Sequence, residues 1–206
     1  MLVHNNARQA LMTKLKTSLS LALVLFCAGC AHSIVTTPDL VELKHGDAQL
    51  IDKNVAYYIS KEDRNKQVST PGGGGDKVSY YPYKELEPAL YKSLSNVFRR
   101  AYPLESPTDL QTIQAKGITF VFTPTIATNS SSESAVTWPP TKFTVTLTCK
   151  AVDVGGKGIW EKQFIGEGAA EFEEFKTDFS LAAKRASQSA FQQFQRALAT
   201  DPEFRR

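Results

Sequence analysis

The stretch "KFTVTLTCKAVDVGGKGIWEKQFIGEGAAEF", residues 142–172, predicts a β-hairpin. In its first part apolar side chains alternate with polar ones, which is typical of a half-buried strand. Glycine-rich residues 155–158 follow, and glycine favours a tight reversal between paired strands. The chain then returns with strand-forming residues, so we expect an antiparallel pair at the heart of a sheet. The alternating apolar positions are Phe143, Val145, Leu147, Cys149 and Ala151.

A helix is predicted directly after this hairpin, over residues 178–199. Its apolar residues recur at helical spacing and form one stripe. Most of that stripe is alanine, which allows the helix to approach a sheet closely. Either Asp178 or Ser180 is expected to cap the first turn, and Pro202 is expected to end the helix. The stripe consists of Ala183, Ala186, Ala190, Phe194 and Leu198.

Two strands and one helix are predicted upstream of the hairpin. Alternating apolar residues indicate strands at 54–60 and 117–127, and helical spacing indicates a helix over 84–102. Residues 61–83, "KEDRNKQVSTPGGGGDKVSYYPY", contain four consecutive glycines and are read as a mobile loop. A serine-rich loop is expected at 128–141.

The predicted order of elements is strand, helix, strand, hairpin, helix. This order indicates an α+β fold of two layers, a mostly antiparallel sheet with two helices on one face. We place a single domain at residues 51–200 and a short tail at 201–206. Residues 30–50 have mixed polarity and are read as a tether.

Side chains suited to catalysis are sparse in this pattern. Cys149 shares the phase of the core positions, so we expect a buried structural side chain. A reactive thiolate needs a basic partner, and the histidines after residue 29 are His32 and His45, both in the predicted tether. Two histidines in a tether also cannot supply the ligands of a catalytic zinc site or the base of a Ser-His-Asp triad. We therefore expect no catalytic residue, no metal and no cofactor.

Two other motifs are interpreted as structural. "GGGGDK" at residues 72–77 lacks the order of a phosphate-binding loop, and Asp76 would repel phosphate, so no nucleotide is expected. Acidic residues gather at the end of the second hairpin strand, which is more typical of a solvated edge than of a glycosidase pair. A carboxylate-based periplasmic enzyme remains the catalytic alternative. The acidic residues are Glu167, Glu171, Glu173 and Glu174.

Residues 1–29 have the layout of a secretory signal peptide. The apolar run "LSLALVLFCAG" is shorter than the ~20 residues that a membrane-spanning helix needs. Small residues end this run, and we predict cleavage between Gly29 and Cys30. An ordinary secretory signal with an incidental cysteine is the alternative. Either Met1 or Met12 serves as the start.

The formal charge of the chain resides in this signal peptide. The chain has 24 Lys+Arg against 21 Asp+Glu, and the signal peptide holds Arg8, Lys14 and Lys16 with no acid. The mature protein is therefore close to neutral. Nucleic-acid binding requires a cationic surplus, so no nucleic-acid partner is expected.

The sequence "LFCAGC", residues 25–30, resembles the lipobox of bacterial lipoproteins. It departs from that family at Cys27, where leucine is usual. The resemblance implies that Cys30 is lipidated with acyl chains such as palmitate and anchors the protein to a membrane. Ala31 replaces the aspartate that favours inner-membrane retention in the family. The resemblance therefore implies the outer membrane, with the domain facing the periplasm.

The element order behind a lipobox also resembles a small periplasmic domain of several envelope proteins. These are the TolB N-terminal region, auxiliary lipoproteins of lipid transporters, the LptE class and activators of peptidoglycan synthases. The resemblance rests on element order, so it transfers no functional residue. It implies an accessory role in the cell envelope. An auxiliary lipoprotein that carries or contacts lipid for an envelope transport system is the alternative.

Aromatic residues in the two predicted loops are the candidate contacts for an envelope protein partner. They follow glycine- and serine-rich segments, and exposed aromatic side chains are frequent anchors of protein interfaces. The sequence therefore predicts a lipid-anchored, non-enzymatic binding or assembly factor. The candidate contact residues are Tyr80, Tyr81, Tyr83 and Trp138.

Overall fold

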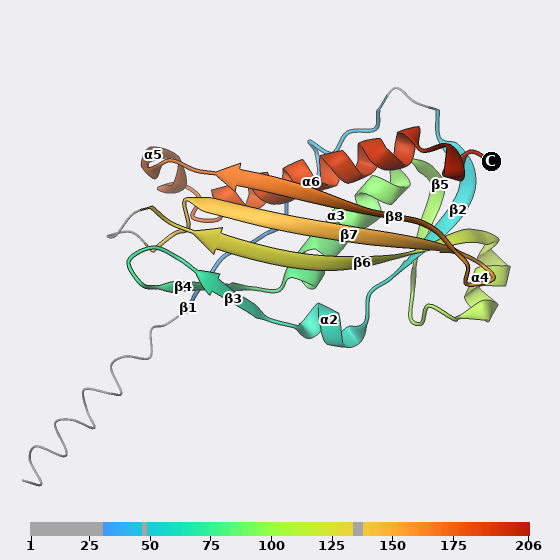
Figure 1. The fold of residues 1–206 in the computed structure, drawn as a ribbon, viewed down its shortest axis with the longest axis horizontal. Coiled ribbons are helices and arrows are strands. Elements are labelled where there is room, and N and C mark those ends of the chain that lie inside the picture. The colour runs from blue at the N-terminus through green and yellow to red at the C-terminus, as the bar shows by residue number, and fades with distance from the viewer. Residues whose placement is uncertain (1–30, 47–48, 134–137) are drawn as a thin grey trace, which may run out of the picture. The chain divides into compact units, whose positions relative to one another are not determined.

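The computed structural model describes residues 31–46, 49–133 and 138–206 (Figure 1). The predicted signal peptide, with Gly29 and Cys30, lies outside the described residues. Residues Ala31–Arg206 group into one compact unit. The α+β fold class is confirmed, because helices pack on a large mixed sheet.

The larger sheet has five strands in the order β5-β2-β6-β7-β8. The strands from β6 to β8 are antiparallel, whereas β2 runs parallel to both of its neighbours, β5 and β6. The sheet is therefore antiparallel on the side of the hairpin and parallel around β2. Its strands are β2 (Ile51–Tyr58), β5 (Phe98–Leu104), β6 (Ile118–Ser131), β7 (Lys142–Asp153) and β8 (Gly158–Ala169).

The predicted hairpin is confirmed as β7 and β8. Phe143 pairs with Gly168, and Leu147 pairs with Phe164, so the buried sides of the two strands are in register. Gly156 has a φ of 81°, a left-handed conformation that glycine adopts without strain. The apolar phase read from the sequence is the buried phase, from Phe143 to Ala151.

Helix α6 (Leu181–Thr200) covers the buried side of this hairpin. A Cβ atom added at Gly166 would lie 2.0 Å from the Ala186 carbonyl oxygen, and one at Gly168 would lie 2.1 Å from that of Ala182. Only glycine in the strand, facing small residues in the helix, allows this approach. The alanine stripe predicted from the sequence therefore packs directly on β8.

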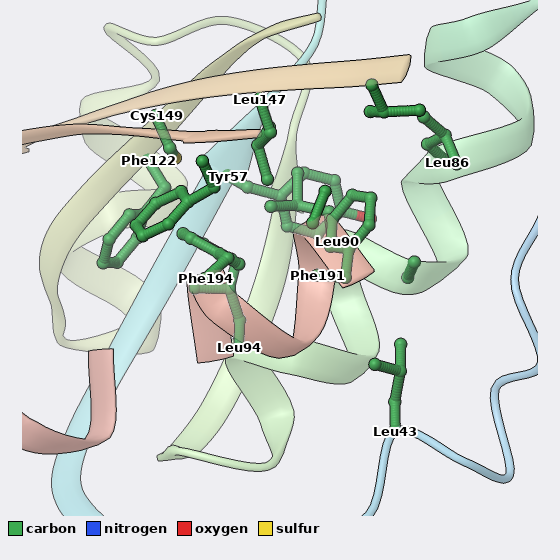
Figure 2. Packing of buried hydrophobic residues seen from close by; sticks show 14 of the residues in the cluster. Leu43, Tyr57, Leu86, Leu90, Leu94, Phe122, Leu147, Cys149, Phe191 and Phe194 are labelled. Atoms are coloured by element: carbon green, nitrogen blue, oxygen red, sulfur yellow. The ribbon is translucent and has the colours of Figure 1, made fainter. Parts of the chain in front are cut away.

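Helix α3 (Pro82–Ser95) packs beside α6 on the same face and completes the main core. Figure 2 shows Leu90 and Leu94 of α3, Phe191 and Phe194 of α6, and Leu147 of β7 in one cluster. All five side chains are 1% exposed or less. Two helices and the sheet therefore share one apolar interior, as the two predicted stripes require.

The helix predicted over 84–102 is correct only up to Ser95, because strand β5 begins at Phe98. Residues 96–102 were included in the predicted helix because the apolar residues Phe98 and Ala101 are three positions apart, as on one face of a helix. In β5 both residues are buried, and the register shift against β2 lies in β2, between Ile51 and Asn54. Two buried strand residues three positions apart thus resembled helical periodicity.

A short helix, α4 (Leu110–Lys116), lies on the opposite face of the sheet, where the sequence predicted none. It contributes Ile113 to a second small core with Val121 and Leu104. Residues of β2 and β6 that face away from the main core are therefore buried as well, where α4 covers the sheet. The prediction that the helices occupy one face therefore holds for α3 and α6 but not for α4.

The predicted mobile loop 61–83 is largely ordered structure. It forms helix α2 (Lys61–Asn65) and strands β3 (Val68–Pro71) and β4 (Lys77–Tyr80). β4 lies between β3 and β1 (Ala31–Ser33) in a second, three-stranded sheet. The glycine run serves only as the turn between β3 and β4, with Gly74 and Gly75 at positive φ. The hairpin was missed because both strands are short.

Both ends of the described chain are packed rather than free. Ile34, Thr36 and Leu43 of the predicted tether are at most 2% exposed. Phe204, in the predicted tail, is fully buried in the 3-10 helix η1 (Pro202–Phe204). Its ring contacts Phe98, which lies 5.5 Å away between ring centres. The domain therefore begins before residue 51 and extends past residue 200.

Candidate functional site

The segment that follows Cys30 is fastened to the domain by hydrogen bonds around Glu85. The backbone N–H and the hydroxyl of Thr36 donate to Glu85 Oε2 over 2.6 and 2.9 Å. The Thr37 hydroxyl donates to the Glu85 backbone oxygen, and the Val35 N–H donates to Ser180 Oγ. We call these five residues the Glu85 clamp. It joins the N-terminal segment to the first turns of α3 and α6.

An aromatic stack lies next to β1, at the end of the domain where Ala31 pairs with Lys77. The His32 ring stacks on Trp138 at 4.2 Å between ring centres and an interplanar angle of 18°. The Phe179 ring also packs on Trp138, at 4.9 Å between ring centres. His32 Nε2 also lies 3.4 Å from Asp76 Oδ2. We call His32, Trp138, Phe179 and Asp76 the β1-end cluster.

The β3–β4 turn fixes the position of Trp138. Gly73 N–H donates to the Trp138 carbonyl oxygen over 2.9 Å. A Cβ atom at Gly72 would lie 2.4 Å from that same oxygen, so glycine is required there. Trp138 was predicted from the sequence as a contact residue, whereas His32, Phe179 and this role of the glycine run were not. Four distant segments build the cluster, and no local pattern in any of them signals it.

The tyrosine motif "YYPY" does not form one contact surface, because two of its three tyrosines are buried. Tyr80 is 1% exposed, and its ring packs on Phe143 at 5.4 Å between ring centres. Tyr83 is 8% exposed, and its hydroxyl accepts a hydrogen bond from the Ile126 N–H. Tyr81, at 37% exposed, is the tyrosine of this group that reaches the surface. The prediction of partner contacts at Tyr80 and Tyr83 is therefore corrected.

The outward side of β6, β7 and β8 forms an open, hydroxyl-rich surface, the open sheet face. Thr146 of β7 lies at its centre, paired with Ala127 of β6 and with Ile165 of β8. Ile165 is half exposed. In Figure 1, α3 and α6 lie on the opposite side of these strands. Its residues are Thr125, Ala127, Asn129, Thr144, Thr146, Thr148, Gln163, Ile165 and Glu167.

Two hollows border the end of the sheet that is nearest β1. One of 420 Å³ lies over Ser131, Thr144 and Glu167, at the end of the open sheet face. The other, of 260 Å³, lies between the end of β8 and helix α5 (Phe172–Phe175). Lys142 lines both hollows and pairs with Glu133. Their mixed polar lining suits a polar contact better than an apolar ligand.

The acidic residues at the end of β8 are engaged in ion pairs. Arg185 holds Glu174 in two hydrogen bonds of 2.8 and 3.1 Å, and this contact lowers the pKa of Glu174 to about 2. Lys176 pairs with Glu173 over 2.7 Å. A carboxylate with so low a pKa stays ionised near neutral pH and is a poor general acid. The interpretation of this cluster as a charged edge is consistent with these contacts.

Cys149 is fully buried, as the strand phase predicted. Burial raises the pKa of its thiol well above the ordinary value. Among the described residues, no group of three or more His, Cys, Asp or Glu side chains is placed to hold a metal ion. In the same part of the chain, no helix is long and apolar enough to cross a membrane.

No family model and no curated protein matches the chain. Solved structures offer distant likenesses. The PelC dodecamer from Paraburkholderia phytofirmans is 14% identical, with a TM-score of 0.39, over 71% of this chain and 94% of that chain. A Xanthomonas campestris protein of family DUF330 is 10% identical, with a TM-score of 0.44, over 82% and 90%.

A Caulobacter crescentus protein described as a candidate lipoprotein is also similar. It is 14% identical to this chain, with a TM-score of 0.33, over 65% of this chain and 86% of that chain. All three TM-scores lie below 0.5, so the likenesses transfer neither a residue nor an activity to this chain.

Proposed function

We propose that the chain is a lipid-anchored protein of the outer membrane that acts in the periplasm as a non-enzymatic binding or assembly factor. One observation carries this proposal: the compact unit begins at Ala31, the residue directly after the predicted lipidated cysteine. Cleavage before Cys30 would therefore release the whole domain with its first strand intact. The predicted cleavage site, between Gly29 and Cys30, and the start of the compact unit at Ala31 are thus one residue apart.

The open sheet face is the proposed surface for an envelope protein partner. It presents threonine hydroxyls, an amide and a half-exposed isoleucine in a regular array across three strands. Hydroxyl and amide groups hydrogen-bond a partner without a large exposed apolar patch, which keeps the unbound protein soluble. Binding rather than catalysis is also supported by the pairing of Glu174 with Arg185 and by the burial of Cys149.

The alternative of an acyl chain held between sheet and helices is disfavoured by the packing. Backbone atoms of α6 contact Gly166 and Gly168 so closely that even a methyl group would not fit. Beside this contact, Phe191 and Phe194 fill the space between α6 and the sheet. An acyl chain would therefore have to displace the core.

Acyl labelling in a bacterial host tests the anchor. Cys30→Ala should abolish incorporation of labelled palmitate and leave an uncleaved precursor, because the thiol is the acylated group. Cys27→Ala is the matched control and should be labelled like the wild type. Labelling that persists in Cys30→Ala would show that the wrong cysteine was chosen.

Separation of inner and outer membranes on a density gradient tests the location. The wild type should sediment with the outer membrane. Ala31→Asp should shift it toward the inner membrane, because aspartate after the lipidated cysteine favours retention there in the lipoprotein family. Wild type found with the inner membrane would contradict the proposed location.

Photo-crosslinking in intact cells tests the partner surface. A benzophenone amino acid at Thr146, in the centre of the open sheet face, should give a discrete crosslinked species. The control position is Gln114, an exposed residue of α4 on a different surface. A crosslink of equal yield at both positions, or at neither, would contradict the assignment of the open sheet face.

A further inference from the structure

We infer that the β1 end of the domain is a membrane-facing surface, held in a fixed orientation against the lipid headgroups by the Glu85 clamp. This inference rests on the proposed anchoring at Cys30 and adds the orientation of the domain and the surface that meets the lipid. The occupant of the surface is the headgroup layer of the anchoring membrane.

The chain between the predicted anchor at Cys30 and the first strand of the domain is very short. Ala31 is already part of β1 and pairs with Lys77, so no flexible residue separates residue 30 from the sheet. One residue spans at most about 3.6 Å. A diacylglycerol group on Cys30 would therefore place Ala31 and its neighbours at the level of the headgroups.

The segment that follows β1 is bonded to the domain and cannot swing away from it. Thr36 is fully buried, and both its N–H and its hydroxyl are bonded to Glu85. Val35 N–H is bonded to Ser180 at the start of α6. The attachment point is thus tied to both major helices. Lipid on Cys30 would hold the domain in one orientation rather than on a loose tether.

The surface beside Ala31 carries aromatic side chains. His32 and Trp138 form an amphipathic stack, and Phe179 beside them is 47% exposed. Phe172 of α5, at the same end of the sheet in Figure 1, is 51% exposed. Aromatic rings with a polar edge are enriched at the level of lipid headgroups. The side chains at the β1 end are therefore of the kind expected at the headgroup layer, where the anchor would place them.

The charges at this end indicate that the contact does not depend on anionic lipid. Several cationic side chains here are paired with an acid, as in Lys142 with Glu133 and Lys184 with Asp178, and the exposed Lys77 beside Ala31 does not amount to a polybasic patch. A polybasic contact with anionic lipid would weaken with salt. An aromatic contact should persist at high salt. It should also be too weak to hold the domain without lipid, because the exposed rings are few.

Fluorescence quenching in lipid vesicles tests the orientation, with Trp138 as the reporter. A chain starting at Cys30 is coupled through its thiol to a maleimide lipid; buried Cys149 should not compete. In vesicles containing headgroup-labelled nitroxide lipid, the Trp160→Phe variant should lose most of its Trp138 emission. The Trp138→Phe variant, which reports on buried Trp160, should lose little. Equal quenching of the two reporters, or none, would overturn the inference.

Two further variants isolate the surface and the clamp. Phe179→Glu should reduce quenching of Trp138, whereas Leu110→Glu, at an exposed apolar residue of α4, should not. A Gly/Ser linker of about 20 residues before Ala31, spanning about 25 Å, should reduce quenching several-fold. Unchanged quenching with the linker would show that the short connection does not orient the domain.

The outcomes separate this inference from the proposed function. Chemical coupling supplies the lipid whether or not cells acylate Cys30, so the orientation is measured independently. An acylated cellular protein whose Trp138 is not quenched would overturn the inference and leave the anchor intact. Failure of acyl labelling in cells would overturn the anchor, and with it the physiological meaning of the orientation.

Discussion

The short elements of the N-terminal half and the long elements of the C-terminal half are held in the domain by different contacts. From β6 onward, long strands and α6 bury large apolar side chains in register, and Phe204 closes the core. Before β6, α3 joins the same apolar core, but short elements such as α2 are also joined by polar contacts between distant segments, such as Thr36 with Glu85 and Arg64 with Glu87. Apolar packing leaves a periodic trace in the sequence, whereas single polar contacts leave none.

The largest effect is expected in the C-terminal half, at Phe204. Its ring lies within 5.6 Å of the rings of Phe98, Phe120, Phe122 and Trp160 between centres. Phe204→Ala should lower the free energy of unfolding by about 3–5 kcal/mol, the usual cost of removing a buried aromatic ring. Urea unfolding of the mature domain measures it. Phe172→Ala, at an exposed ring, should change it by less than about 0.5 kcal/mol.

A somewhat smaller effect is expected where α6 meets β8. Gly166→Ala places a methyl group 2.0 Å from a backbone oxygen of α6, so the helix must shift. Overpacking of this kind costs about 1–3 kcal/mol, and we expect the upper end because backbone cannot rotate away. Gly158→Ala in the same strand is the control, since its Cβ would meet nothing within 4 Å. Equal stability of the two variants would contradict the close packing.

The same contrast explains which parts of the fold could be predicted from the sequence. The β7–β8 hairpin and α6 were predicted correctly, because alternation from Phe143 to Ala151 and the alanine stripe are local signals. Strand β5 was read as helix, because its buried residues Phe98 and Ala101 are three positions apart, which is also a helical interval. Strands β1, β3 and β4 have three or four residues, too few for a period to emerge.

The candidate site was less predictable than the fold. Trp138 was selected as an aromatic residue in a polar loop, but its neighbours His32 and Phe179 come from segments far away in sequence. Tyr80 was read as exposed, because its burial depends on pairing of β3 with β4 and on hydroxyl contacts with Thr70 and Thr128. Such contacts arise from tertiary structure, and residue type alone does not encode them.

A moderate effect is expected at the Glu85 clamp in the N-terminal half. Glu85→Gln should lower the free energy of unfolding by about 1–2 kcal/mol, because hydrogen bonds to a charged group become neutral ones. The Thr36 amide should also exchange with solvent faster by hydrogen exchange. Glu105→Gln, at an exposed residue, is the control. Unchanged exchange at Thr36 would show that other contacts hold the segment.

The smallest effect is a pH dependence of the N-terminal half, where α2 meets α3. Arg64 donates to both oxygens of Glu87 over 2.8 and 2.9 Å, and these bonds lower the pKa of Glu87. In the unfolded chain a glutamate has a pKa of about 4.3. Above that pH the Glu87 carboxylate is ionised in both the folded and the unfolded chain, and the ion pair stabilises the fold fully. As the pH falls below it, the unfolded state takes up the proton first, so the stabilisation declines.

Glu87→Gln should therefore be less stable than the wild type by about 1 kcal/mol at pH 7, the size expected for a partly exposed ion pair. The difference should shrink as the pH falls through the range below about 4.3. Urea unfolding of both proteins from neutral to acidic pH measures it. Phe204→Ala should keep its full deficit relative to wild type over the same range, because no charge is removed. A Glu87→Gln deficit that does not depend on pH would show that shape, rather than charge, holds α2 on α3.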